Sequence, residues 1–263
     1  DEGKMDEAWA AIEPALTSGK TKNLAGAYNF AGVIQGKILS AEITKAAQKQ
    51  PLDTMKFINA LDKSVEYFEK SYKLDNAPNE KGKIKPKYNN NAEAPFQSNT
   101  KMISQMMNYY AYAGQFLNAN GNQKGAYDAF EKFIEMPKSS VFTKQQADSI
   151  YKANANEYYT IAFYATLLGY QIKDYDRALK HIDFALQDTA QKNKNDLYFI
   201  KAQSLLQKKD TAAWVKCATE AITALPNNTQ FVQNLLYYYN IKHLDNEAVA
   251  TAKDLVAKAP NNK

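Results

Sequence analysis

The sequence predicts an all-α fold, a right-handed superhelical solenoid of stacked helix-turn-helix repeats. Pro226 and Pro260 lie 34 residues apart, and each is followed by Asn-Asn, in the segments ALPNN and KAPNN. The polar turns QKKDT and KHLDN precede these prolines at nearly the same offset. The 263 residues include only 8 Pro and 10 Gly, which is few for an all-β chain with many turns. Together these observations favour a helical repeat.

Helical segments with this spacing can be followed along the chain. MDEAWAAIEPALT looks like the second helix of a repeat whose first helix is missing. AYNFAGVIQGK then begins the first complete repeat, and SVEYFEKSYKLD is its partner helix. The next repeat has fixed positions at Gly114, Ala126, Phe130 and Pro137. Three further repeats are centred on one residue each: Thr166, Ala202 and Leu236.

A small residue marks the point where the two helices of a repeat cross. Gly32, Gly114 and Ala202 hold that position in three of the repeats. Two helices approach closely only where a small side chain leaves room, and a larger side chain on the partner helix fills the adjoining space. The larger partner is Phe68 for Gly32 and Phe130 for Gly114. Each helix pair leaves an apolar face uncovered, so neighbouring repeats are expected to stack.

This pattern resembles the tetratricopeptide repeat, a helix-turn-helix unit of 34 residues. KDYDRALKHIDFAL and YDAFEKFIEMP carry the resemblance most specifically, and it covers nearly the whole chain. Thr166, Trp214 and Leu236 are larger than the residues usual at their positions. The layout is similar to bacterial tetratricopeptide proteins of the cell envelope. That similarity implies an exported, periplasmic or cell-envelope protein, with a cytoplasmic location as the alternative.

Insertions interrupt the period at two places. The first, between Gly32 and Phe68, contains SAEITKAAQKQP and is expected to lengthen the first helix before a turn at Pro51. The second, at about 75–100, is rich in Asn, Pro and Lys and predicts a long polar loop that is mobile or ordered by a partner. No stretch has the composition of a linker between domains. Residues 1–263 are therefore expected to form a single domain.

The one dense basic stretch, KGKIKPK, lies in the second insertion. The rest of the net charge of +5 is spread along the chain. A basic cluster can contact an anion or a nucleic acid, but beside Pro86 and a run of Asn the favoured interpretation is a solvated loop. We therefore predict no nucleic-acid partner. The sequence also has no run of about 18 apolar residues, so no membrane-spanning segment is predicted.

No motif in the sequence points to catalysis, a metal ion or a cofactor. GNQKG at 121–125 follows a helical segment and lacks the G-x-x-x-x-G-K-[ST] spacing of a phosphate-binding loop, so it is interpreted as a turn between helices. His181 and His243 have no metal-ligating partner at helical spacing. The single cysteine, Cys217, is expected in the core. We predict that the protein is not an enzyme and needs no cofactor.

Tyrosine is abundant, with 18 copies, and it concentrates in NYYAY at 108–112 and LLYYYN at 235–240. Tyr110, Tyr112 and Tyr239 are expected to pack between helices. Each residue turns a helix by about 100°, so three consecutive tyrosines cannot all face inward. Tyr237 or Tyr238 should therefore be exposed, where an aromatic side chain can anchor a partner.

In tetratricopeptide proteins the first helix of each repeat lines a concave groove that binds a peptide or a partner's helix. Transferring that frame to this sequence implies an inner face rich in amides and aromatic rings, with little charge. Asn29, Ala111 and Phe163 stand where the family's carboxylate clamp requires cations, so an acidic chaperone C-terminus is not the expected ligand. The implied partner-binding residues are Asn29, Gln115, Asn118, Phe163, Tyr170, Phe199, Gln203, Gln233 and Tyr237.

The predicted function is a non-enzymatic protein–protein interaction scaffold that holds a partner peptide or protein segment, of unknown identity, in the concave groove. Amide and aromatic side chains also suit a carbohydrate. The alternative is therefore a small-ligand receptor of the cell envelope that binds a peptide or an oligosaccharide. That alternative predicts a deep pocket near four aromatic residues: Phe163, Tyr170, Phe199 and Tyr237. A third hypothesis is a weak homo-oligomer, because Trp9 and Leu16 on the unpaired first segment need covering.

Overall fold

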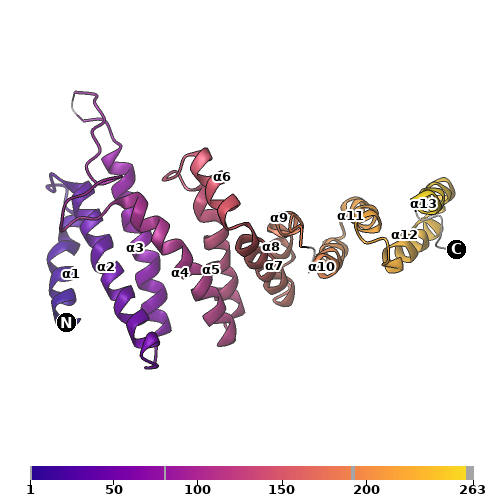
Figure 1. The fold of residues 1–263 in the computed structure, drawn as a ribbon, viewed down its shortest axis with the longest axis horizontal. Helices are drawn as coiled ribbons and strands as arrows, with labels where there is room; N and C mark the ends of the chain where they lie inside the picture. The colour runs from indigo at the N-terminus through magenta and orange to yellow at the C-terminus, as the bar shows by residue number, and fades with distance from the viewer. Residues whose placement is uncertain (1, 80, 191–192, 259–263) are drawn as a thin grey trace. The chain divides into compact units, whose positions relative to one another are not determined.

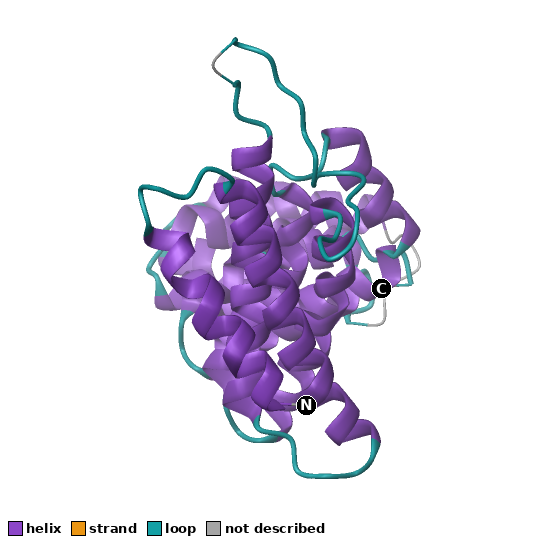
Figure 2. Cartoon of the chain, turned by 90° about the vertical axis from the view of Figure 1, so that its left-hand side faces the viewer, coloured by secondary structure: helices purple, strands orange, loops and turns teal. Residues whose placement is uncertain are grey.

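The computed structural model describes residues 2–79, 81–190 and 193–258. These residues form helices joined by turns and loops, and they contain no β-strand (Figures 1 and 2). The predicted all-α class is therefore confirmed. The helices fall into two compact units that meet in sequence between Asn154 and Ala155. The stacked solenoid, the tetratricopeptide identity and the single domain stay predictions.

The first unit contains long helices joined by short turns, except for one long loop before its fourth helix. Helices that follow one another in the chain pack side by side, from α1 on α2 to α4 on α5. The bounds are α1 Glu2–Thr17, α2 Leu24–Ala47, α3 Thr54–Asp75, α4 Asn99–Ala119, α5 Gln123–Glu135, the 3₁₀ turn Met136–Lys138 and α6 Lys144–Ala153.

The second unit contains shorter helices. The segment KDYDRALKHIDFAL, which carries the repeat resemblance, forms two short helices that meet at His181, whose backbone leaves the helical conformation at φ −112° and ψ 4°. The second proline of the repeat spacing, Pro260, lies outside the described residues. The bounds are α7 Ala155–Gln171, α8 Tyr175–Lys180, α9 Ile182–Ala185, α10 Lys194–Gln207, α11 Thr211–Ala224, α12 Thr229–Ile241 and α13 Asp245–Lys258.

The close helix crossings predicted at Gly32 and Gly114 are confirmed. A Cβ atom added to Gly114 would lie 2.3 Å from two ring carbons of Phe130 on α5. A Cβ atom added to Gly32 would lie 3.0 Å from the ring of Phe68 on α3. Both rings are fully buried and occupy the space that a larger residue would need. These two glycine–phenylalanine pairs set how closely α2 approaches α3 and α4 approaches α5.

The GNQKG segment is the turn between α4 and α5, as predicted. Gly121 has φ 79°, a left-handed conformation that suits glycine because it has no side chain. The side chain of Asn122 then caps α5, accepting a hydrogen bond from the backbone N–H of Gly125 at 2.9 Å. The glycines therefore serve the helix ends, and the turn belongs to the scaffold.

The predicted long loop is present, from residue 76 to 98, and it projects beyond the end of α3 (Figure 2). Its second half is held by the chain itself. The buried carboxylate of Asp75 accepts hydrogen bonds from the backbone N–H groups of Lys87, Tyr88 and Asn89 at 2.8, 2.7 and 3.0 Å. Such charge-assisted bonds to consecutive N–H groups fix the course of the backbone.

A cluster of buried polar side chains holds the end of the same loop. This amide cluster consists of Asn29 on α2, Ser71 on α3, Asn89 in the loop and Asn99 on α4. Asn99 Nδ2 donates to Ser71 Oγ at 3.0 Å and to Asn89 Oδ1 at 2.9 Å, and Asn29 Nδ2 donates to Asn99 Oδ1 at 2.8 Å. Since all four side chains are buried, the network joins three helices and the loop in one fixed arrangement.

The core of the second unit is built around Trp214, Cys217 and Leu235, from α11 and α12. Two tyrosines, Tyr198 on α10 and Tyr239 on α12, complete it. Cys217 is the expected core residue. Side chains from three neighbouring helices thus meet in one buried cluster, which holds this part of the chain together.

The tyrosine predictions have mixed outcomes. Tyr110 and Tyr239 are buried, as expected, and Tyr237 is 68% exposed, also as expected. The expectation for Tyr112 is wrong, because its side chain is 42% exposed. The ring of Tyr112 lies on the unit's surface, against Phe57 at 5.9 Å and Phe116 at 6.3 Å between ring centroids. Contacts with two aromatic rings are therefore not enough to bury the side chain of Tyr112.

The first helix is covered in part by its neighbours. Trp9 on α1 stacks on Tyr67 of α3, with ring centroids 5.8 Å apart, and the Lys63 ammonium lies 5.7 Å from the Trp9 ring. Trp9 and Leu16 are half-buried within the unit. None of the described helices is both long and apolar enough to cross a membrane. Self-association stays a prediction.

Candidate functional site

A groove of about 650 Å³ lies between α2 and α4 of the first unit. Each helix lines it with residues three or four positions apart, so the walls follow the helical repeat. We call it the α2–α4 groove. Its lining residues are Val33, Gly36, Lys37, Leu39 and Ser40 from α2, Gln97 from the loop, and Met102, Gln105, Met106, Asn108 and Tyr109 from α4.

The floor of the α2–α4 groove is apolar and adaptable. Gly36 is buried in this floor, and the methyl groups of Met106 and Met102 lie 3.4 and 4.0 Å from where its Cβ would be. Val33 and Leu39 are buried beside it. Methionine is unbranched and can repack around ligands of different shape. Because its methionine side chains can repack, this floor can accommodate apolar groups of different shapes from a partner.

The rim of the groove is polar and nearly neutral. Gln97, Gln105 and Asn108 are exposed, and each offers an amide donor and acceptor. Lys37 is the one charged side chain among the described residues that line the groove. Amides at the rim over an apolar floor can bind a main chain and its side chains together. The chemistry available is hydrogen bonding and apolar contact.

Asn29 is not available to a partner, contrary to the implied site. Its side chain is 0% exposed, and its amide bonds to the loop backbone. Asn29 Nδ2 donates to Gln97 O at 2.7 Å, and Asn29 Oδ1 accepts from Gln97 N at 3.0 Å. Gln97 also lines the α2–α4 groove, so the loop closes one end of the face on which Asn29 was expected. Asn29 is a structural residue.

Gln115 and Asn118 are exposed on α4, as a partner-binding role requires. Gln115 is seven residues after Asn108, so the two share one side of the helix. The groove, however, is formed closer to the N-terminus of α4, at Met102–Tyr109. Gln115 therefore lies on the same side of α4 as the groove but nearer the C-terminus, and a partner-binding role for Gln115 and Asn118 stays a prediction.

Phe163 and Tyr170 on α7 are half-buried. Phe163 lines a cavity of about 10 Å³ together with Tyr159 and Leu197, room for about one water molecule. The ring of Tyr170 packs against that of Tyr175, with centroids 6.3 Å apart. A cavity of this size at Phe163 does not accommodate a sugar ring or a peptide side chain.

Four of the implied residues lie on α10 and α12: Phe199, Gln203, Gln233 and Tyr237. Phe199 is 43% exposed, Gln233 is exposed and Gln203 is half-buried. The two helices are neighbours at their N-terminal ends, where Asn228 Nδ2 donates to Asn195 Oδ1 at 2.6 Å. Phe199 and Tyr237 are thus accessible aromatic side chains on adjacent helices.

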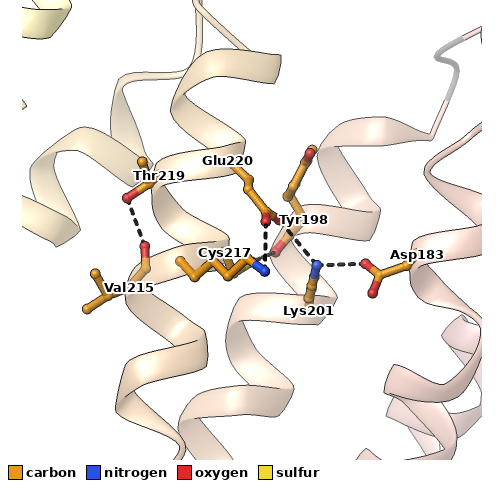
Figure 3. A network of polar contacts seen from close by, with 8 residues as sticks. Asp183, Tyr198, Lys201, Val215, Cys217, Thr219 and Glu220 are labelled. Atoms are coloured by element: carbon orange, nitrogen blue, oxygen red, sulfur yellow. Dashed lines mark hydrogen bonds and ion pairs between the residues drawn. The ribbon is translucent and has the colours of Figure 1, made fainter.

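A polar network crosses the second unit (Figure 3). The Lys201 ammonium on α10 lies 2.7 Å from Asp183 Oδ1 on α9 and 3.3 Å from Glu220 Oε2 on α11. Burial lowers the pKa of Lys201, but the two carboxylates outweigh it and the net pKa is raised. Lys201 is therefore held charged, as a link between three helices.

The thiol beside this network is not activated. Cys217 is buried, and burial raises the pKa of its thiol to about 11. A nucleophilic cysteine needs the opposite shift, toward the thiolate. In the described part of the chain, no group of three or more His, Cys, Asp or Glu side chains is arranged to hold a metal ion.

The sequence frame missed most of the groove's residues. Four residues that line the groove are absent from the residues that the repeat frame implied: Gly36, Met102, Gln105 and Asn108. The sequence does contain a pattern that points to two of them. Gln105 and Asn108 repeat the residue types and spacing of Gln115 and Asn118, ten residues earlier in the chain. Comparison with known proteins adds no relative, since no protein-family model and no curated protein matches the chain.

Proposed function

We propose that the protein is a non-enzymatic interaction scaffold, and that it binds an extended segment of a partner protein in the α2–α4 groove. The observation that carries the proposal is the groove's composition: exposed amides along the rim over a floor of methionine and glycine. An extended segment has unpaired backbone N–H and C=O groups at regular spacing, which side-chain amides can pair with.

The size and charge of the groove favour a peptide that is largely uncharged. A volume of about 650 Å³ accommodates several residues of an extended chain. Lys37 can take one acidic side chain or a terminal carboxylate, but no second cation lies among the described lining residues. The methionines adapt to different apolar side chains, so selectivity would come mainly from the backbone and from the one charge.

The receptor hypothesis has less support in the second unit. It required a deep aromatic pocket, whereas the cavity beside Phe163 holds about 10 Å³. Phe199 and Tyr237 instead stand on open helix surfaces and suit the rim of a protein contact. Binding of an oligosaccharide in the α2–α4 groove is the alternative, and the binding experiment distinguishes it from binding of a peptide.

The test is selection of a random peptide library on the immobilised full chain, followed by calorimetry with the selected peptides. Gln105→Ala/Asn108→Ala removes two rim amides of the α2–α4 groove. Each lost hydrogen bond to a neutral partner is worth about 1 kcal/mol, so affinity should fall on the order of tenfold or more. Both side chains are exposed, so the fold should tolerate the change.

The matched control lies on the same helix. Gln115→Ala/Asn118→Ala removes the same two residue types at the same spacing, outside the groove lining. If both variants lose the same affinity, the bound peptide extends along α4 beyond the groove, as far as Gln115 and Asn118. If both variants bind the selected peptides with wild-type affinity, the α2–α4 groove is not the binding site. Selection of no peptide, with binding of neutral oligosaccharides on a glycan array, would replace the scaffold by a sugar receptor.

A further inference from the structure

The loop between α3 and α4 carries a basic segment that the proposed scaffold role does not use. In residues 76–90 the sequence has four lysines and one acidic residue, Glu80, a net charge of +3. The lysines alternate with uncharged residues in KGKIKPK, and all of this segment, residues 81–87, is exposed. We call residues 81–87 the basic arm. It projects beyond the end of α3, away from the helices of its unit (Figures 1 and 2).

The base of the basic arm is fixed. Asp75, at the last position of α3, accepts the backbone N–H of Lys87 at 2.8 Å. Within the loop, a local turn orders the start of the arm: Asn79 Oδ1 accepts the N–H groups of Lys81 and Lys83 at 3.0 and 3.1 Å, and Asn79 N donates to Lys83 O at 3.0 Å. Because one end is anchored on α3 and the other is ordered by this turn, binding would not have to order the whole arm.

An apolar side chain stands in the middle of the charges. Ile84 is 56% exposed and lies between Lys83 and Lys85. A single exposed aliphatic side chain is common on protein surfaces, so Ile84 matters here because four lysines surround it. Cations around an exposed aliphatic residue match a surface that is anionic outside and apolar beneath.

We propose that the basic arm docks the protein on an anionic lipid bilayer. The lysine ammonium groups would lie against anionic headgroups, and Ile84 would reach the boundary with the acyl chains. A nucleic acid fits less well, because the arm has no aromatic side chain for base stacking and no arginine for bidentate contacts. This contact is independent of the α2–α4 groove, since none of the arm's residues lines it.

The test is co-sedimentation of the full chain with vesicles of phosphatidylcholine containing phosphatidylserine, and with vesicles of phosphatidylcholine alone. Binding is expected to the mixed vesicles only and to weaken as salt is raised. Lys81→Gln/Lys83→Gln/Lys85→Gln should weaken it on the order of a hundredfold, at about fivefold per lysine. Circular dichroism should show an unchanged helix content, because the arm lies outside the helices.

The matched control removes equal charge elsewhere: Lys20→Gln/Lys22→Gln/Lys144→Gln, all exposed and outside the arm. It should retain most of the vesicle binding. Equal loss in the control would show a general charge effect and overturn the proposal. So would equal binding to vesicles of phosphatidylcholine alone, or no vesicle binding by the wild type. Binding of a single-stranded oligonucleotide without binding of vesicles would also overturn it, in favour of a nucleic-acid contact.

Discussion

The side-chain amide of Asn29 and the backbone of Gln97 exchange two hydrogen bonds, 2.7 and 3.0 Å long, across 68 residues of sequence. An asparagine side chain imitates a peptide group, so it can pair with a backbone unit as a strand would. The bond pair seals the end of the α2–α4 groove with the loop. It also explains why a buried asparagine is present on an otherwise apolar side of α2.

Asn29→Ala should destabilise the first unit by about 1–3 kcal/mol, because the buried Oδ1 of Asn99 would lose its donor and the loop backbone at Gln97 would lose two hydrogen bonds. Urea unfolding followed by circular dichroism measures the change. Asn118→Ala, an exposed amide on α4, is the control and should stay within about 0.5 kcal/mol of the wild type. A wild-type midpoint for Asn29→Ala would show that water replaces the lost amide.

Gly114→Ala should be costly, because its Cβ would lie 2.3 Å from the Phe130 ring. Overpacking of this kind destabilises by about 1–3 kcal/mol. Gly36→Ala is the matched control on α2, since its nearest neighbour is the flexible Met106 methyl at 3.4 Å. That change should be neutral or stabilising by up to about 1 kcal/mol, because alanine favours a helix.

The same crossing permits a rescue experiment. Phe130→Leu removes part of the ring that would meet the new Cβ. The double variant Gly114→Ala/Phe130→Leu should therefore lose less stability than the two single changes added together. Strict additivity of the three unfolding free energies would contradict the proposed steric conflict.

Asp75→Ala should release the base of the loop. Three backbone N–H groups would lose their acceptor, and limited trypsin digestion should then cut faster at Lys87 while the helices stay intact. Mass spectrometry of the early fragments identifies the site. Asp53→Ala, which removes the side-chain cap of α3, controls for a general loss of helix stability. If trypsin cuts at Lys87 equally faster in both variants, the effect is a general loss of helix stability and not the loss of the hydrogen bonds from Asp75.

The buried thiol predicts a loss of stability in alkali. Burial raises the Cys217 pKa from 9.0 to about 11 in the folded chain, so the folded state holds this proton more tightly than the unfolded state. The contribution is fully present below pH 9.0 and is lost as the pH rises toward about 11. The difference in unfolding free energy between wild type and Cys217→Ala should shrink across that window. A difference independent of pH would contradict the raised pKa.

Local rules in the sequence predicted the helices, the turn at GNQKG and the two crossings at Gly32 and Gly114. These features depend on backbone conformation, on helical periodicity and on the volume of one residue at one position, which are local properties. The rotation of about 100° per residue likewise predicted that Tyr237 or Tyr238 is exposed, and Tyr237 is. Helical spacing also places Gln115 on the side of α4 that carries Asn108, which lines the groove.

The tertiary structure alone decided where that groove lies and what closes it. The loop from residue 76 to 98 returns to α2 through Asn29 and Gln97, a contact that no local pattern contains. Tyr112 stays 42% exposed, because Phe57 of α3 and Phe116 cover only part of its ring, although the aromatic run around it suggested burial. Burial depends on which segments far apart in the chain pack together. Sequence periodicity therefore predicts on which side of a helix a residue lies, but it does not determine whether another segment covers that side.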